Sequence, residues 1–256
     1  MYVRGMDGNA RLSALVDVLQ RDGRLDVAEM AAVMGAAEMT IRRDLDRMVA
    51  MGLARRVRGG AVNLLMRGQE LPFAMRVLDR AEAKQRIAVA VGQTVRDGEA
   101  VILDSGTTAV LAAQALTWRR LTVMPLSLHA ATALAASESI RLLMPGGEAR
   151  PGELSMVGPL ALASIRALRF DTAVVSCCGL ADGRITTHNL GDAEVKLAMV
   201  RSAARVVIVA DGSKFRATAM AVVCAATEAD LVITDSDAPG DAVEALRSGG
   251  VEVQCV

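Results

Sequence analysis

The chain has 256 residues, 52% of them hydrophobic, and a formal net charge of zero at pH 7. This length and apolar content allow a sizeable core and two domains, and the zero net charge argues against indiscriminate binding of nucleic acid by the whole molecule. No apolar run reaches the roughly 18 residues of a membrane-spanning helix, and the N-terminus lacks the hydrophobic region of a signal peptide, so we expect a cytoplasmic protein.

The first domain, expected at residues 8–64, begins with two short amphipathic helices. Apolar residues recur at helical spacing at Leu12, Leu15, Val16 and Leu19, and again at Val27, Met30, Ala31 and Met34. Asp26 is expected to cap the second helix, with Glu29 in the position of a capping box, and Gly35 is expected to end it. The first 66 residues contain ten arginines and no lysine, which favours forked contacts with phosphate or guanine.

A basic helix and a Gly-Gly hairpin follow. The helix contains Thr-Ile-Arg-Arg-Asp-Leu at residues 40–45, and its apolar residues Ile41, Leu45, Met48 and Val49 form one inward stripe that leaves the arginines outside. A solvated helix with incidental arginines is the alternative. However, the order of three helices and a hairpin is typical of a winged helix-turn-helix, whose third helix enters the major groove. The residues expected to contact DNA are Thr40, Arg42, Arg43, Arg47, Arg55, Arg56, Arg58, Gly59 and Gly60.

The rest of the chain predicts a linker at residues 65–82 and an α/β domain at residues 83–256. Short apolar runs typical of buried strands lie at 100–103, 121–124, 140–144, 172–176, 206–210, 221–224 and 231–234. Helical stretches separate them at 110–116, 130–137, 160–168 and 193–203. This alternation predicts an α/β fold with a mostly parallel sheet, in which ligands bind beyond the carboxyl ends of the strands.

The first strand-to-helix turn, at residues 104–108, has the composition of a phosphate-binding loop. Asp104 is followed by Ser105, Gly106, Thr107 and Thr108, so hydroxyl groups and a flexible glycine precede the free N–H groups of a helix. The alternative is an ordinary helix capped by Ser or Thr. Polar or small residues also follow the later strands, at Ser127, Gly146, Gly147, Gly179, Asp211 and Lys214. Lys214 would add a charge for phosphate, or it is an ordinary surface lysine.

The four cysteines are Cys177, Cys178, Cys224 and Cys255. Their spacing fits no zinc site. Cys177 and Cys178 are adjacent in a strand-like run, where neighbouring side chains point to opposite faces and cannot form a disulfide without distortion. We interpret the four as small buried hydrophobic residues, with a redox sensor as the alternative.

Residues 11–61 resemble the DeoR-type helix-turn-helix. Its signature contains Thr-Ile-Arg-Arg-Asp-Leu and ends in Arg-x-x-Gly-Gly-Ala, and both parts are present, at residues 40–45 and 56–61. Members of that family usually have Val-Ser before the recognition helix, where this chain has Ala36-Ala37. The missing hydroxyl should cost the helix ~1 kcal/mol and one phosphate contact.

Residues 83–235 are similar to the sensor domain of the same family, a relative of sugar-phosphate isomerases. The matching motifs are Lys84 with Ile87-Ala88, Asp104 to Thr108, Gly146-Gly147, Gly158, Asp171, Ala210-Asp211 with Ser213-Lys214-Phe215, and Thr234-Asp235. The resemblance implies a phosphorylated sugar or related metabolite as effector, held at residues 104–108, Gly146-Gly147 and Lys214. Where the family commonly has Thr-Asn-Ser, this chain has Pro125-Leu126-Ser127, so we expect a smaller, less polar or differently oriented effector.

These features predict a metabolite-responsive transcriptional regulator and favour a repressor of a carbohydrate or related catabolic operon. It would bind double-stranded operator DNA as a homo-oligomer, since one winged unit reads few base pairs. The alternative is an isomerase or deaminase of sugar phosphates, with Asp104, Asp171 and Asp211 as available bases but no evident acid partner. His129 and His188 are isolated and favour structural roles, so we expect no catalytic residue, metal or cofactor. A purely architectural DNA binder would leave the larger domain without a task.

Overall fold

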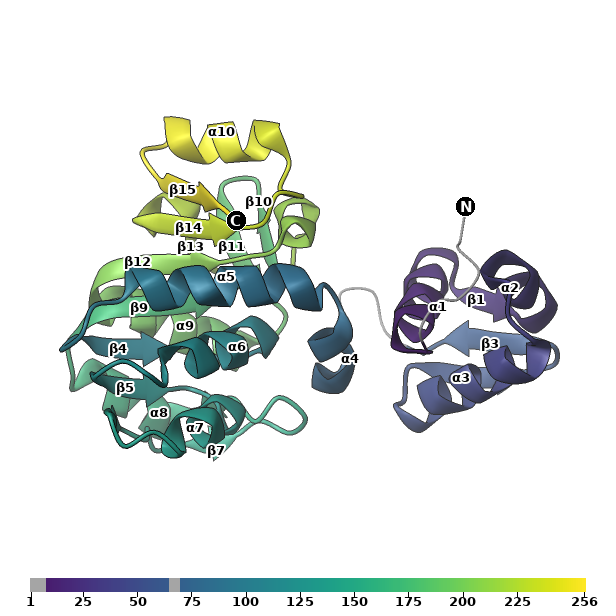
Figure 1. Cartoon of the computed structure of the whole chain (residues 1–256), viewed down its shortest axis with the longest axis horizontal. Coiled ribbons are helices and arrows are strands. Elements are labelled where there is room, and N and C mark those ends of the chain that lie inside the picture. Colours follow the sequence, from purple (N-terminus) through teal and green to yellow (C-terminus); the bar gives the residue numbers. More distant parts are fainter. Residues whose placement is uncertain (1–7, 65–69) are drawn as a thin grey trace. The chain divides into compact units, whose positions relative to one another are not determined.

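The computed structural model describes residues 8–64 and 70–256 (Figure 1). The chain divides into two compact units, with the boundary between Asp79 and Arg80. Of the segment expected to be a linker, residues 65–69 lie outside the described residues. A short helix, α4 (Phe73–Leu78), follows them and belongs to the first unit.

The N-terminal unit is a winged helix-turn-helix, as the sequence predicted. It contains α1 (Gly8–Asp22), α2 (Val27–Met34) and α3 (Glu38–Ala50), with the strands β1 (Arg24–Asp26), β2 (Ala54–Val57) and β3 (Gly60–Asn63). The antiparallel strands β2 and β3 form the wing, and β1 pairs with the other side of β3. Strand β1 was not predicted, because three residues are too few to show an alternating pattern.

Local capping explains where the second and third helices begin and end. The Asp26 carboxylate accepts hydrogen bonds from the backbone N–H groups of Ala28 (2.9 Å) and Glu29 (3.1 Å), so the predicted N-cap of α2 is confirmed. Gly35 ends α2 in the left-handed conformation, at φ 60°. Helix α3 begins after Ala37, and no side chain caps it, as expected from the missing hydroxyl.

The core of this unit consists of the predicted helical stripes. Leu12, Leu15 and Leu19 of α1 pack with Ile41, Leu45 and Met48 of α3, and all are almost fully buried. The prediction that Val49 faces inward is wrong, since Val49 is 36% exposed. At about 100° per residue it lies roughly 80° around the helix from Ile41, which places it at the margin of the stripe.

The C-terminal unit is a seven-stranded sheet covered by helices on both faces. In the order β15-β14-β12-β9-β4-β5-β6, every neighbouring pair is parallel. The strands are β4 (Ala100–Leu103), β5 (Leu121–Pro125), β6 (Ile140–Leu142), β9 (Phe170–Ser176), β12 (Ala203–Val209), β14 (Leu231–Thr234) and β15 (Glu252–Cys255). The helices are α5 (Ala81–Thr94), α6 (Thr107–Leu116), α7 (Leu128–Ala135), α8 (Pro159–Arg166), α9 (Leu190–Ser202) and α10 (Gly240–Ser248). The predicted α/β fold with a mostly parallel sheet is confirmed.

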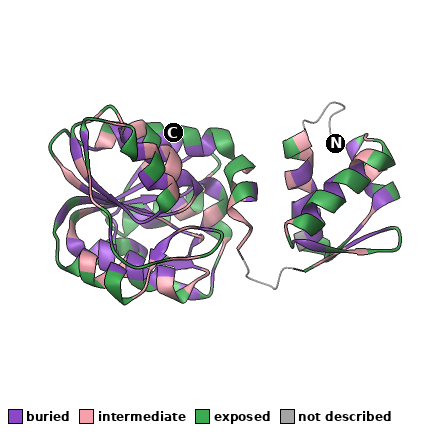
Figure 2. Ribbon diagram, turned by 90° about the horizontal axis from the view of Figure 1, so that it is seen from below, coloured by how far each residue is buried: buried purple, intermediate pink, exposed green. Residues whose placement is uncertain are grey.

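Two separate apolar cores lie on the two faces of this sheet. Helices α5, α6 and α7 pack with one set of strand residues, which includes Val101 and Leu103. Helices α8, α9 and α10 pack with the other set, which includes Ile102. The alternation along β4 follows from the two-residue period of a strand. Figure 2 shows the buried strands between helices whose outer surfaces are exposed.

One predicted strand was assigned to the wrong sheet. Residues 221–224 do form a strand, β13 (Ala221–Ala225), but it pairs antiparallel with β11 (Arg184–Thr187), which in turn pairs with β10 (Gly179–Ala181). The segment between β12 and β13 contains only the short 3₁₀ helix η1 (Gly212–Arg216). It is too short for the crossover that a parallel strand needs, which takes about a dozen residues or more. A further two-stranded ribbon joins β7 (Glu148–Ala149) and β8 (Met156–Val157).

The four cysteines are free thiols. Cys177 and Cys224 are buried, and burial raises the pKa of each thiol to about 12. The interpretation of all four as buried residues is wrong for Cys255, which is exposed because it ends the edge strand β15, and Cys178 is only partly buried. Within residues 8–64 and 70–256, no cluster of three or more His, Cys, Asp or Glu side chains could hold a metal ion. No helix in the same ranges is long and apolar enough to cross a membrane.

Candidate functional site

The outer face of α3 presents the arginines that the sequence singled out. Arg42, Arg43 and Arg47 are all exposed, whereas Thr40 near the start of the helix is half-buried. Arg42 forms an ion pair with Glu38 (3.1 Å), and Arg47 lies 3.9 Å from a carboxylate oxygen of Asp44. Among the described residues, Arg43 has no ion-pair partner. Its guanidinium is therefore the one on this face that is available to a phosphate or a base without breaking an existing pair.

The wing arginines differ in accessibility. Arg55 and Arg58 are exposed, but Arg56 is half-buried and its Nε lies 3.4 Å from the carboxylate of Asp46 on α3. This ion pair ties the wing to the recognition helix. Arg56 thus links the hairpin to α3, while the side chains of Arg55 and Arg58 are open to solvent.

Glycine is needed at the two wing positions 59 and 60 for different structural reasons. Gly59 has φ 80°, the left-handed conformation that a tight hairpin turn requires. Gly60 is buried against β1, and a Cβ atom there would lie only 1.8 Å from the carbonyl oxygen of Leu25. Gly60 therefore allows the close approach of β1 and β3, so a direct DNA contact is not needed to explain it.

One buried ion pair in this unit was not predicted. Asp44 lies in the basic helix but is only 3% exposed, and it accepts a hydrogen bond of 2.6 Å from Nε of Arg11 on α1. Because Asp44 and Arg11 are 33 positions apart, local periodicity gave no sign of the pair. It fixes α3 against α1 and so holds the exposed arginines in place.

In the C-terminal unit, polar residues gather at the carboxyl edge of the parallel sheet. Four strands lie side by side in the order β14-β12-β9-β4, and all four run in the same direction. The residues that follow them, Asp104, Cys177, Ala210 and Asp235, therefore lie along one edge. This edge is where ligands bind in open α/β sheets.

The loop after β4 leads directly into the N-terminus of α6. Gly106 is the N-cap residue, with φ 93°, and no side chain caps the helix. The alternative interpretation, in which Ser or Thr hydroxyls serve as ordinary caps, is therefore wrong here. Ser105, Thr107 and Thr108 are mostly buried around the first turn. The uncapped N–H groups of α6 make a favourable environment for an anion.

Asp104 is the centre of a buried polar network. Its carboxylate accepts hydrogen bonds from Nζ of Lys196 on α9 and from the backbone N–H and the hydroxyl of Ser176, both at 2.8 Å. Burial lowers the pKa of Lys196, but the neighbouring Asp104 carboxylate outweighs it, so the pKa is raised and the ammonium group stays charged. The negative charge of Asp104 is thus compensated, and its repulsion of an anion at the start of α6 is reduced.

A second polar cluster follows β12 and β14. The guanidinium of Arg80 lies 3.7 Å from Asp211, 3.9 Å from Asp235 and 2.9 Å from Asp237. Lys214 lies 3.9 Å from the carboxylate of Asp211. Burial alone would raise the pKa of Asp211. The charge of Lys214 and a hydrogen bond from the Ser213 hydroxyl together outweigh burial, so the pKa is lowered and the carboxylate is ionised. Lys214 is therefore not an isolated surface lysine.

The other predicted effector residues have structural explanations of their own. The Ser127 hydroxyl, completely buried, caps α7 by accepting from the N–H of His129 (3.2 Å). A Cβ atom on Gly147 would lie 2.7 Å from a carbonyl oxygen of β8, and one on Gly179 would lie 2.1 Å from the carbonyl oxygen of Ala217. Gly146 is exposed next to α8. Leu126, where the resemblance implied an amide, packs in the core and is 1% exposed.

Lys196 is the buried partner of Asp104 that the sequence analysis missed. Helix α9 buries most of its circumference, including Val195, Met199 and Val200, and leaves one side exposed. A lysine in such a helix needs a buried anionic partner, so its position was a usable signal. The same helix carries Asp192, which pairs with Arg150 (2.8 Å) and accepts from Ser155 (2.9 Å).

A winged helix-turn-helix with exposed arginines, followed by an α/β unit with an anion-compatible edge, defines a ligand-responsive DNA-binding regulator. The DeoR-like helix-turn-helix domain matches residues 11–64, and the DeoR C terminal sensor domain matches residues 79–236. The chain belongs to the DeoR family, which consists of transcriptional regulators rather than enzymes.

Similar proteins span almost the whole chain. It is 31% identical to "Transcriptional repressor AccR" of Agrobacterium fabrum, over 88% of this chain and 89% of that protein. It is 26% identical to the "Glycerol-3-phosphate regulon repressor" of Escherichia coli strain K12, over 97% of this chain and 99% of that protein. Among solved structures, ribose 5-phosphate isomerase A from Methanocaldococcus jannaschii is 18% identical with a TM-score of 0.40, covering 54% of this chain and 55% of that one.

Proposed function

We propose that this protein represses a carbohydrate or related catabolic operon and that a phosphorylated sugar-type metabolite releases it from operator DNA. The observation that carries the proposal is that one chain has both an arginine-bearing helix, α3, and an uncapped N-terminus of α6 at the carboxyl edge of the parallel sheet. Relatives described as repressors, including that of the glycerol-3-phosphate regulon, support both the sign of regulation and a phosphorylated effector.

In the DNA-bound state, Arg43 would contact a base or a phosphate, and it could do so without breaking an existing ion pair. Arg42 and Arg47 would add contacts on the same face, with Thr40 near the start of the helix. Arg55 and Arg58 would anchor the wing to the backbone, and Arg56, Gly59 and Gly60 would hold its shape. Each phosphate contact made by these arginines should add to the salt dependence of binding.

In the effector-bound state, the phosphate would lie at the N-terminus of α6. Its partners would be the N–H groups and hydroxyls of Ser105, Gly106, Thr107 and Thr108. Lys214 would contribute a positive charge from the end of β12, which is separated from β4 by β9, while Asp104 and Asp211 would orient the cationic groups. Ser127, Gly146, Gly147 and Gly179 would shape the walls of the site. The change in DNA affinity cannot exceed the difference in effector affinity between the two states.

Recognition of an operator by this protein would require at least two copies. One winged unit covers few base pairs, and paired units read half-sites about 34 Å apart, one turn of the duplex. We therefore propose a homo-oligomer. Because its target is the operator, the site of action would be the cytoplasm.

The effector half of the proposal is tested with a thermal-shift panel of glucose 6-phosphate, fructose 1-phosphate, fructose 6-phosphate and glycerol 3-phosphate, followed by calorimetry of the compound that raises the melting temperature most. Thr107→Ala should weaken its binding, because Thr107 begins α6. Thr117→Ala is the matched control, since Thr117 ends the same helix. Equal affinities for the two variants would remove the start of α6 from the site. Turnover of any panel compound by the purified chain would instead point to an enzyme.

A further inference from the structure

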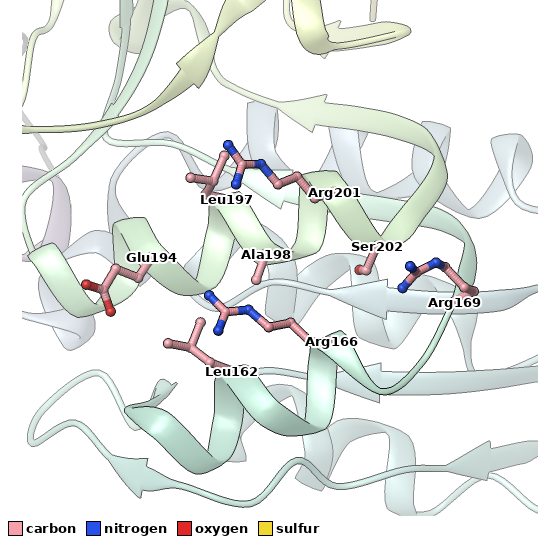
Figure 3. A pocket seen from close by; sticks show the side chains of 8 residues that line it. All are labelled: Leu162, Arg166, Arg169, Glu194, Leu197, Ala198, Arg201 and Ser202. Atoms are coloured by element: carbon pink, nitrogen blue, oxygen red, sulfur yellow. The ribbon is translucent and has the colours of Figure 1, made fainter.

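A second region suited to an anion lies between α8 and α9, on the outer side of the helices that cover one face of the sheet. The two helices enclose a groove of about 530 Å³, which is within the range of small-molecule sites. Three arginines line it, Arg166, Arg169 and Arg201, together with the apolar side chains of Leu162 and Leu197. Figure 3 shows Arg166 reaching from α8 toward α9, with Arg201 on α9 and Arg169 beyond the end of α8.

The positive charges of the three arginines in the groove are only partly balanced by nearby carboxylates. Within the described part of the chain, neither Arg166 nor Arg201 has an ion-pair partner, and Arg169 donates only to the carbonyl oxygen of the adjacent Leu168 (3.0 Å). The sole carboxylate in the lining is Glu194, so the lining carries an excess of two positive charges. Like charges held around one hollow repel each other, and a bound anion would relieve that repulsion.

Helix dipoles account for only part of this arrangement. Arg166 lies in the last turn of α8 and Arg201 in the last turn of α9, where a positive charge stabilises a helix C-terminus. That effect explains one basic residue at each helix end. It does not explain the third arginine, Arg169, in the loop beyond α8, or the hollow with apolar walls that the three share.

We propose that this groove binds a small organic dianion, a phosphomonoester or a dicarboxylate with an apolar body. The forked guanidinium groups match the oxygens of phosphate or carboxylate, and two net positive charges match a dianion. Leu162 and Leu197 would bury the apolar part of the ligand. The inference does not depend on the proposed function.

The groove is separate from the effector edge, although α9 contributes to both. Lys196 of α9 is buried and points to Asp104 at the carboxyl edge, whereas Leu197 and Arg201 line the outer groove. Arg166 and Arg201 lie at the C-terminal ends of their helices. Because α8 leads directly into β9 and α9 directly into β12, these ends lie toward the amino edge of the sheet. A ligand in the groove would therefore be additional to the effector.

The test is calorimetric titration of the full chain with phenyl phosphate at low ionic strength. R166Q/R201Q should bind it at least ten-fold more weakly than the wild type. R141Q/R184Q is the matched control, because it removes the same charge from two exposed arginines on strands β6 and β11, and it should bind like the wild type. Equal affinity of the two double variants would overturn the proposal.

Two further arms define the ligand. Titration with phthalate in place of phenyl phosphate distinguishes a dicarboxylate site from a phosphate site. The proposal is supported if the wild type binds either compound and R166Q/R201Q binds that compound more weakly. Inorganic phosphate should bind more weakly than phenyl phosphate, because it leaves Leu162 and Leu197 uncovered. Sedimentation velocity of the same proteins tests the competing occupant: if R166Q/R201Q alone converts an oligomer to a monomer, a second copy covers the groove and the ligand site is refuted.

Discussion

The buried pair between Lys196 and Asp104 gives the sharpest energetic prediction. Lys196→Met removes the ammonium group but keeps the length of an apolar side chain, and it leaves the Asp104 carboxylate, 2% exposed, without its cation. Removing one partner of a buried pair costs about 3–5 kcal/mol, because the remaining charge stays desolvated and unpaired. In a unit of this size 1 kcal/mol corresponds to roughly 2–4 °C, so the melting transition of the C-terminal unit should fall by about 6–20 °C.

A double-mutant cycle separates the pair from the rest of the network. Asp104→Asn alone should also destabilise, since it leaves the charge of Lys196 buried, whereas Lys196→Met with Asp104→Asn removes both charges. The double variant should therefore lose about 1–3 kcal/mol less than the sum of the single variants. Lys214→Met is the control: its side chain is 25% exposed and its nearest carboxylate oxygen is 3.9 Å away, so it should cost less than about 1 kcal/mol.

The assay is urea unfolding of the full chain followed by far-ultraviolet circular dichroism, with the two units fitted as separate transitions. Additivity of the two single variants within about 0.5 kcal/mol would refute the reasoning. It would mean that the charges of Lys196 and Asp104 do not interact in the folded protein, and that the carboxylate at the start of α6 is not neutralised by α9.

Three shorter predictions concern the rest of the molecule. Ala37→Ser should stabilise the N-terminal unit by about 1 kcal/mol, because Ala37 has the extended backbone of an N-cap without a capping side chain; Ala50→Ser, at the other end of the helix, should not stabilise in urea unfolding. Gly60→Ala should disrupt the wing and abolish DNA binding in a mobility-shift assay, since its Cβ would collide with a β1 carbonyl oxygen; native affinity would contradict the packing. Iodoacetamide at pH 8 should modify Cys255 first and leave Cys177, whose pKa is about 12, protected in mass spectrometry; faster labelling of Cys177 would show that it is not buried.

Local patterns were enough to predict the fold of both units. Helical periodicity and the cap at Asp26 predicted the winged helix-turn-helix, and apolar runs separated by helices predicted the parallel sheet. The boundaries of the predicted α/β elements differ from the observed ones by at most three residues. The short strands β1, β7, β8, β10, β11 and β15 were not predicted. The assignment of residues 221–224 to the parallel sheet was wrong, because a strand's partner depends on the length of its connection rather than on its own composition.

The candidate site was only partly predictable for a similar reason. Runs such as Ser105 to Thr108 are visible because their residues are adjacent in the sequence. The partner of Asp104, Lys196, lies 92 positions away, and the partner of Asp44, Arg11, lies 33 positions away. No local period encodes which two distant charges will meet, so these pairs became apparent only when the packing of α9 and α1 was known.

The central claim is that exposed arginines of α3 contact duplex DNA. The direct measurement is in vitro selection from a random duplex library with the full chain, followed by fluorescence anisotropy titration of the selected duplex with the wild type, Arg43→Ala and the control Arg141→Ala. Arg43→Ala should bind at least ten-fold more weakly, corresponding to about 1.4 kcal/mol or more, while Arg141→Ala should bind like the wild type. No enrichment of a motif, or equal binding by the two variants, would contradict the claim.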